Sequence, residues 1–336
     1  MYTSLKEKLG HLLPDSTIRQ KAELAEEINT LKAERNAIIL VHNYMEPAMF
    51  YSIADFAGDS LELSRKAAET DKDVIVFCGV LFMAESAKIL SPDKTVLAPD
   101  PNAGCSLAEG ITAEDVRNLK KQYPGLPVVT YINTYADVKA ETDICCTSGN
   151  AVGVINSLDS DAVIFLPDQY LSANIAKLVN KKIIYPTRDK NTEFTGKEVI
   201  GWDGYCEVHR RFTIEDIQHA REQYPDVFVL AHPECPPEII DQVDFAGGTT
   251  AMMKQVAASD AKYVLVLTEC CMIDILRAEH PEKVFISWAH LRCPHMSKVT
   301  MENTRDALQQ MQHVIEVPQE IAKRARVSVE RMIAIS

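Results

Sequence analysis

Apolar runs rich in Val, Ile and Leu alternate with polar and amphipathic stretches along the chain, and one arrangement of them occurs three times. Each copy begins with an apolar run that ends in polar residues, at 37–44, 128–133 and 227–234. A second short segment that ends in a hydroxyl residue follows, at 54–60, 142–148 and 243–249. Two more apolar runs complete each copy, at 74–78 and 95–97, at 162–166 and 182–185, and at 263–267 and 283–286. Uninterrupted runs of this kind are typical of strands buried in a parallel sheet.

Helix-forming stretches separate these strands. Residues 61–68, for example, directly follow Ser60, which places Ser60 near a helix N-terminus, and we expect Ser148 and Thr249 to lie likewise. Strands that alternate with helices predict parallel sheets flanked by helices, so the sequence predicts an α/β fold of three similar αβα domains. The alternative is a chance similarity among common βαβ units. The three domains are expected at residues 1–105 together with 288–336, 106–195 and 196–287.

Polar residues at the strand ends are the first candidates for function. In parallel sheets, ligands bind beyond the carboxyl ends of the strands, where helix N-termini offer free N–H groups. Such ends carry His42, Tyr131, Asn133, His232 and Glu234. Three domains that face one another would gather these side chains around one central cavity.

Composition and charge narrow the class of protein. Apolar residues make up 46% and charged residues 25% of the chain, and no apolar run is long enough to span a membrane, as in soluble globular proteins. The first residues contain no apolar run after their charges, so we expect no secretory signal or transit peptide and a cytoplasmic location. A formal net charge of -13 without a cluster of Lys and Arg argues against a nucleic-acid partner.

Three of the nine cysteines occupy matching places in the loop beyond the fourth strand of each copy, namely Cys105, Cys206 and Cys293. Soft thiolates select iron–sulfur clusters or zinc, and a cluster held by three thiolates leaves one iron free to act as a Lewis acid. Zinc bound through Cys206 and His209, in a Cys-x-x-His motif, is the alternative. The cysteines in or beside apolar runs are expected to be small buried side chains: Cys78, Cys145, Cys146, Cys270 and Cys271.

Seven short motifs follow one another along the chain: HNY at 42–44, DFAGDS at 55–60, GCSLA at 104–108, YINT at 131–134, TSGNAV at 147–152, CEVH at 206–209 and HPECPP at 232–237. In this order they resemble the quinolinate synthase family of bacterial NAD biosynthesis, from about Ile38 to the C-terminus. The resemblance implies three similar αβα domains in a pseudo-threefold arrangement around a central site. It also implies a reaction that condenses iminoaspartate with dihydroxyacetone phosphate and releases phosphate and two waters to give quinolinate.

The resemblance further implies a 4Fe-4S cluster with three cysteine ligands, which here would be Cys105, Cys206 and Cys293. The remaining iron would bind a nitrogen, carboxylate or hydroxyl of the substrate and assist the loss of hydroxide. L-Aspartate oxidase is an expected transient partner, and whether it forms a stable complex stays open. A non-catalytic iron–sulfur sensor or scaffold is the alternative function, although polar residues that converge on an open iron favour the enzyme.

Roles for individual residues follow from the resemblance, motif by motif. Glu234 is the expected general base, and Tyr44 and Tyr131 are expected proton donors or acceptors, with His232 as a further catalytic residue. Two carboxylates and a phosphate need cationic or N–H-rich surroundings. The residues expected to bind the substrates are His42, Ser60, Tyr131, Asn133, Ser148, His209, His232, Glu234 and Thr249.

Two features qualify these roles. From the residues alone, a Ser or Thr that precedes a helix is better explained as a helix cap, and only the resemblance favours a substrate contact. Members of the family often have serine at the position of Gly248, so Thr249 is expected to make the contact there alone.

Overall fold

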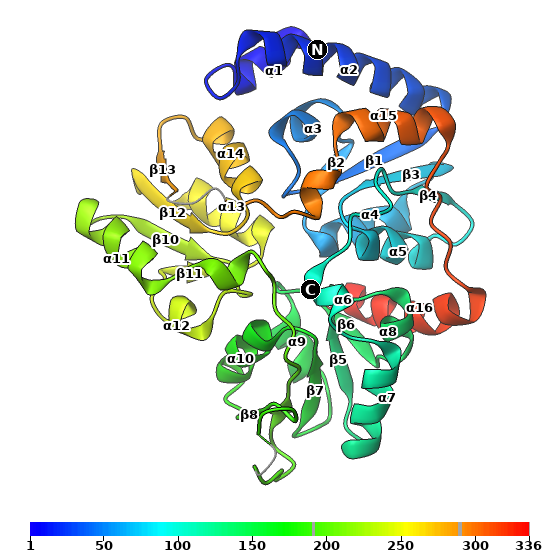
Figure 1. The fold of residues 1–336 in the computed structure, drawn as a ribbon, viewed down its shortest axis with the longest axis vertical. Helices are drawn as coiled ribbons and strands as arrows, with labels where there is room; N and C mark the ends of the chain where they lie inside the picture. The colour runs from blue at the N-terminus through cyan, green and yellow to red at the C-terminus, as the bar shows by residue number, and fades with distance from the viewer. Residues whose placement is uncertain (190–191, 288–290, 336) are drawn as a thin grey trace.

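Three parallel sheets organise the chain in the computed structural model, which describes residues 1–189, 192–287 and 291–335. Figure 1 shows them as three lobes around a common centre. The first sheet has the order β2-β1-β3-β4, from β1 (Ala37–His42), β2 (Phe56–Gly58), β3 (Val74–Cys78) and β4 (Thr95–Leu97). The third repeats this order as β11-β10-β12-β13, from β10 (Phe228–Ala231), β11 (Phe245–Ala246), β12 (Tyr263–Leu267) and β13 (Val284–Ile286). The predicted fold of three αβα units with parallel sheets is confirmed.

The second sheet departs from this order at one edge. It runs β6-β5-β7-β9-β8, from β5 (Val128–Tyr131), β6 (Ile144–Cys146), β7 (Val163–Leu166), β8 (Ile183–Ile184) and β9 (Val199–Ile200). The predicted run at 182–185 forms β8 at the edge of the sheet, and β9 pairs with β7. Residues 199–200 therefore complete the second sheet, although the expected boundary placed them in the third domain.

Helices connect the strands and flank the sheets of the three lobes (Figure 1). The first lobe has α1 (Tyr2–Leu9), α2 (Asp15–Glu34), α3 (Pro47–Ser52), α4 (Ser60–Glu69) and α5 (Leu81–Leu90). The second has α6 (Ser106–Glu109), α7 (Ala113–Gln122), α8 (Ala136–Ala140), α9 (Ala151–Asn156) and α10 (Gln169–Leu178). The third has η1 (His209–Arg211), α11 (Ile214–Gln223), α12 (Pro237–Ile240), α13 (Thr249–Ala258) and α14 (Cys270–Glu279). The chain ends with η2 (Met296–Lys298), α15 (Met301–Gln310) and α16 (Gln319–Ala334).

The last two helices return to earlier parts of the fold. α15 packs against α2 and β3 of the first lobe. α16 packs mainly against α8 and β6 of the second lobe and also against α5 of the first, so it joins the two. No helix in the described part of the chain is long and apolar enough to cross a membrane.

One aspartate in each lobe fixes the first two strands relative to each other. Asp55, Asp143 and Asp244 precede the second strand of their sheets. In each lobe a carboxylate oxygen accepts a backbone N–H of the first-strand segment at 2.8 Å, and the aspartate N–H returns a hydrogen bond to the carbonyl of the same residue. The carboxylate thus satisfies a buried donor that the short second strand leaves unpaired.

We expect Asp143→Ala to lower the free energy of unfolding by about 1–3 kcal/mol, because it leaves the N–H of fully buried Val128 without an acceptor. Urea unfolding followed by circular dichroism measures the change. Asp93→Ala, at an exposed position, is the control and should cost less than about 0.5 kcal/mol. Equal changes in the two variants would contradict the role of Asp143.

Candidate active site

The carboxyl ends of the strands in all three sheets face one cavity of about 770 Å³, part of which opens to solvent. All the residues that the sequence predicts for the site line it: His42, Tyr44, Ser60, Cys105, Tyr131, Asn133, Ser148, Cys206, His209, His232, Glu234, Thr249 and Cys293. The expected central cavity is therefore present, and each lobe contributes to it.

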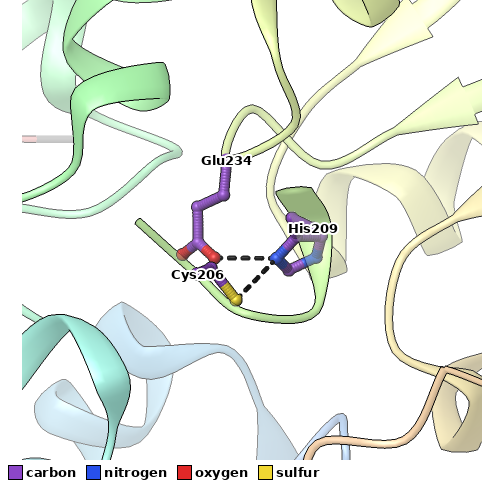
Figure 2. Close-up of side chains that lie close together, drawn as sticks. All are labelled: Cys206, His209 and Glu234. Carbon is purple, nitrogen blue, oxygen red and sulfur yellow. Dashed lines mark hydrogen bonds and ion pairs between the residues drawn. The ribbon is translucent and has the colours of Figure 1, made fainter. Parts of the chain in front are cut away.

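Glu234 lies at the middle of the polar network and is only 4% exposed. Tyr131 Oη donates to its Oε1 at 2.5 Å, and His209 Nδ1 lies 2.8 Å from its Oε2 (Figure 2). Burial raises the pKa of Glu234, but His232, His209 and the hydrogen bond from Tyr131 together hold that pKa below its ordinary value. Glu234 is therefore a carboxylate at neutral pH.

Two phenols and two imidazoles of the cavity are neutral. Burial and the charge of Glu234 raise the pKa of Tyr44 and of Tyr131 well above the usual value. Burial lowers the pKa of His42 to about 4 and that of His232 to about 3. At neutral pH both tyrosines keep their protons, and these two histidines offer N–H groups rather than positive charge.

A second chain of hydrogen bonds joins the first lobe to the third. Tyr44 Oη, beyond β1, lies 2.6 Å from Thr268 Oγ1, beyond β12. The same Thr268 oxygen lies 2.9 Å from His209 Nε2. Asn43 Nδ2 donates to Thr249 Oγ1 at 2.9 Å. Thr268 thus holds His209 at Nε2, while Glu234 lies at Nδ1.

The three predicted hydroxyl residues differ in their relation to the helices. Ser60 and Thr249 are the first residues of α4 and α13, as expected. Ser148 lies instead in a turn before α9, where its Oγ is 3.3 Å from His232 Nε2. A Cβ added to Gly248 would lie 3.1 Å from Ser148 Oγ, so the glycine leaves room for that hydroxyl.

The three predicted cluster ligands lie in equivalent loops that connect successive lobes. Two backbone N–H groups face each sulfur, from the residues two and three positions further along the chain. Burial raises the pKa of the Cys105 thiol to about 12, and its two N–H groups oppose that rise. Hydrogen bonds of this kind to sulfur are a normal feature of iron–sulfur ligands. The loops therefore fit a cluster with three cysteine ligands.

A capped helix follows each of these cysteines at the same distance. The cap is in each case a threonine seven positions after the cysteine: Thr112 of α7 after Cys105, Thr213 of α11 after Cys206, and Thr300 of α15 after Cys293. Each threonine forms a capping box with the residue three places further, which ends the loop at a defined point. This pattern is present in the sequence and strengthens the equivalence of the three loops.

Glu269 also lines the cavity, although it is not among the residues predicted from the sequence. Its Oε2 accepts the N–H of Cys271 at 2.7 Å, which caps α14, and its Oε1 accepts the N–H of Cys293 at 3.3 Å. Burial raises the pKa of Glu269 to about 8. Asp168 caps α10 from the same position, two residues beyond the third strand of its sheet. An acidic residue at this place in two of the repeats is the signal that could have found both.

Asn174 on α10 holds the loop that carries Glu234. Its Nδ2 donates to the carbonyl oxygens of Pro233 at 2.9 Å and of Cys235 at 3.0 Å, and its side chain is 5% exposed. The second lobe thus positions a residue of the third. Because this contact depends on tertiary packing, the sequence carries no local sign of it.

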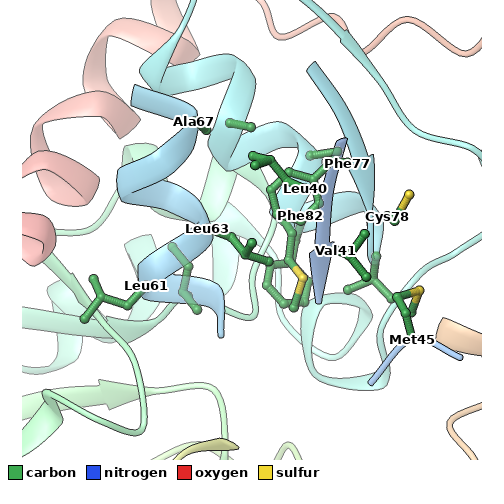
Figure 3. Close-up of a cluster of buried hydrophobic side chains, with 14 of the residues drawn as sticks. Leu40, Val41, Met45, Leu61, Leu63, Ala67, Phe77, Cys78 and Phe82 are labelled. Carbon is green, nitrogen blue, oxygen red and sulfur yellow. The ribbon is translucent and has the colours of Figure 1, made fainter. Parts of the chain in front are cut away.

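Part of the cavity wall is apolar and rigid. Phe82 of α5 lines the cavity and belongs to the cluster of buried side chains around β1, β3 and α4 (Figure 3). Leu40, Leu63 and Phe77 belong to the same cluster. Close packing behind this wall limits its movement toward or away from the polar groups.

Known proteins match this chain over nearly its whole length. The sequence model of the family described as quinolinate synthetase A protein matches residues 26–334. Quinolinate synthase 2 of Mesorhizobium japonicum is 50% identical over 331 residues, which cover 98% of this chain and 97% of that protein. The quinolinate synthase of Agrobacterium fabrum is 48% identical, with coverage of 99% and 91%. That of Xylella fastidiosa is 49% identical, with coverage of 99% and 94%.

We expect Asn174→Ala to loosen the Glu234 loop, because it removes both hydrogen bonds that α10 makes to that loop. Hydrogen exchange of the segment 232–236 should become faster, and the free energy of unfolding should fall by about 1–3 kcal/mol. Asn118→Ala, at an exposed position in α7, is the matched control. Unchanged exchange in 232–236 would show that Asn174 does not hold the loop.

Proposed function

The chain belongs to the quinolinate synthase family of enzymes, and we propose on this basis that it condenses iminoaspartate with dihydroxyacetone phosphate to quinolinate, with loss of phosphate and two waters. The observation that carries the proposal is the convergence of the motif residues from three lobes on one cavity. A buried carboxylate, two protonated phenols and neutral imidazoles suit a reaction with several proton transfers.

Cys105, Cys206 and Cys293 are the proposed ligands of a 4Fe-4S cluster. The support is the equivalence of their loops, in which two backbone N–H groups face every sulfur. When bound, such a cluster supplies one iron without a protein ligand, a Lewis acid for the loss of hydroxide.

Glu234 is the proposed general base. Its lowered pKa keeps it ready to accept a proton at neutral pH, and Tyr131 and His209 hold its two oxygens in place. Tyr44 and Tyr131 are the proposed proton donors, because their raised pKa values keep the phenols protonated. His232 is neutral and contacts Ser148, so it serves as a donor or acceptor of a hydrogen bond to substrate.

The substrate phosphate and carboxylates are assigned to the helix N-termini at the cavity. Thr249 opens α13, a ten-residue helix without a side-chain cap, whose first N–H groups attract anions. At α4 the carboxylate of Asp59 already accepts the first N–H groups, so Ser60 contributes its hydroxyl there. Ser148, Asn133 and His42 add neutral polar groups at the same cavity. The proposal thus relies on N–H and O–H donors rather than on charged histidines.

An anaerobic assay with dihydroxyacetone phosphate, and with iminoaspartate generated in place by L-aspartate oxidase, should yield quinolinate. Cys105→Ala should abolish both the brown colour of the cluster and turnover, because it removes one of the three sulfurs. Cys78→Ser, which changes a buried cysteine outside the cavity, should keep both. A brown protein that makes no quinolinate would point instead to a sensor or scaffold.

Glu234→Gln should lower kcat at least about 100-fold, because an amide cannot accept the proton, while the visible spectrum of the cluster stays the same. Steady-state kinetics and absorption spectra of the same preparation measure the two effects. Glu238→Gln, on the exposed side of α12, is the matched control. A near-normal kcat in Glu234→Gln would exclude Glu234 as the base.

A further inference from the structure

Three donor atoms of different chemistry meet beside the cavity, from Cys206, His209 and Glu234 (Figure 2). His209 Nδ1 lies 3.2 Å from Cys206 Sγ and 2.8 Å from Glu234 Oε2, and all three atoms lie within 4.8 Å of one another. From this geometry we propose that these residues form a zinc site, which Zn²⁺ occupies when the chain lacks its cluster.

The donor set matches the preferences of Zn²⁺. One thiolate, one imidazole and one carboxylate are all normal zinc ligands, and three protein ligands leave a fourth position for water, as in catalytic zinc sites. Ligand atoms around tetrahedral zinc lie about 3–4 Å apart. His209 Nδ1 needs to move away from Cys206 Sγ and from Glu234 Oε2 by only a few tenths of an ångström to reach such spacings.

Groups around these ligands are arranged as in a built metal site. His209 Nε2 lies 2.9 Å from Thr268 Oγ1, which can accept the Nε2–H of the tautomer that turns its Nδ1 lone pair to the metal; the Nδ1–H that faces Glu234 in the metal-free chain is absent from that tautomer. Tyr131 Oη donates to Glu234 Oε1 and leaves Oε2 for the ion. The negative charges of the thiolate and the carboxylate balance Zn²⁺, and the displaced thiol proton leaves to water.

Zinc and the cluster exclude each other, because both require the sulfur of Cys206. Zinc would also occupy Glu234, the proposed base, so the zinc form is inactive and resists reconstitution of the cluster. Cys105 and Cys293 take no part in the zinc site.

Another group of donors, Glu269, Cys270 and Cys271, meets the same distance limit. The carboxylate of Glu269 already accepts the N–H of Cys271 and the N–H of Cys293. Metal binding there would compete with the cap of α14, and the group has no imidazole. The Cys206 site is therefore the one that we propose.

The test uses full-length chain freed of cluster by chelator and reductant without oxygen, and Co²⁺ as a spectroscopic probe for zinc. Co²⁺ should give tetrahedral ligand-field bands and a thiolate charge-transfer band, and one equivalent of Zn²⁺ should displace it. The bands should persist in the Cys105→Ser/Cys293→Ser double variant. Cys206→Ser should lose the charge-transfer band, and His209→Gln and Glu234→Gln should weaken Zn²⁺ binding by more than about tenfold.

Thr268→Val gives a milder test, because it changes no ligand. It should weaken Zn²⁺ binding by about tenfold or more, since it removes the partner of His209 Nε2. Thermal unfolding of each apo variant shows whether it is folded. If Cys206→Ser is unfolded, the Zn²⁺ affinities of Thr268→Val and Glu234→Gln test the site in its place. Loss of the bands in the double variant, or their absence from the unmodified chain, would overturn the proposal.

These measurements need no substrate and no turnover. A failure to bind Zn²⁺ at these residues leaves the proposed synthase activity untouched, and a failed synthase assay leaves the zinc site untouched. As a second readout, apo protein preloaded with one equivalent of Zn²⁺ should reconstitute its brown cluster more slowly than metal-free protein. Equal rates for the two would contradict a site that shares Cys206.

Discussion

A carboxylate buried where three lobes meet is the feature on which the rest of the structure depends. Removal of such a charge from water is costly unless hydrogen-bond donors surround it. Glu234 obtains donors from Tyr131 of the second lobe and from His209, while Asn174 of the second lobe holds its loop. Separation of the lobes would remove the hydrogen bond from Tyr131 and leave the charge with His209 of its own lobe. Docking of the lobes and formation of the site are therefore one and the same requirement.

The loops that contain Cys105, Cys206 and Cys293 connect each lobe to the next and so help to keep the lobes docked around the site. Each loop turns two N–H groups toward its sulfur and ends seven positions later at a capped helix that belongs to the following lobe. The third loop leads into α15, which packs against β3 and so brings the chain back to the first lobe. Ligands placed on the connections, rather than on the strands, approach a common point from three directions.

The apolar runs were sufficient for most of the strands and for the polar residues at their ends, and the family motifs supplied the other predicted residues of the cavity. β9 was not predicted, because a strand of two residues is too short to show a periodic pattern of apolar positions. Only its pairing with β7 places it in the second sheet. Ser148 was misplaced relative to its helix, since the chain makes a turn before α9 begins. Glu269 and Asn174 act through caps and loop contacts whose partners are distant along the chain or in another lobe. Such contacts follow from packing, which a pattern of apolar positions does not contain.

The donors that make this cavity reactive also make it attractive to another metal. A base beside a metal-bound substrate must lie near a metal ligand, so a carboxylate and an imidazole inevitably approach Cys206. Affinity alone does not separate iron from zinc in a site with sulfur, nitrogen and oxygen donors, and selection must come from geometry and from the supply of metal. In the proposed enzyme Cys105 and Cys293 would provide that geometry, because they add sulfurs that a cluster can use and that a single zinc ion at Cys206 does not bind.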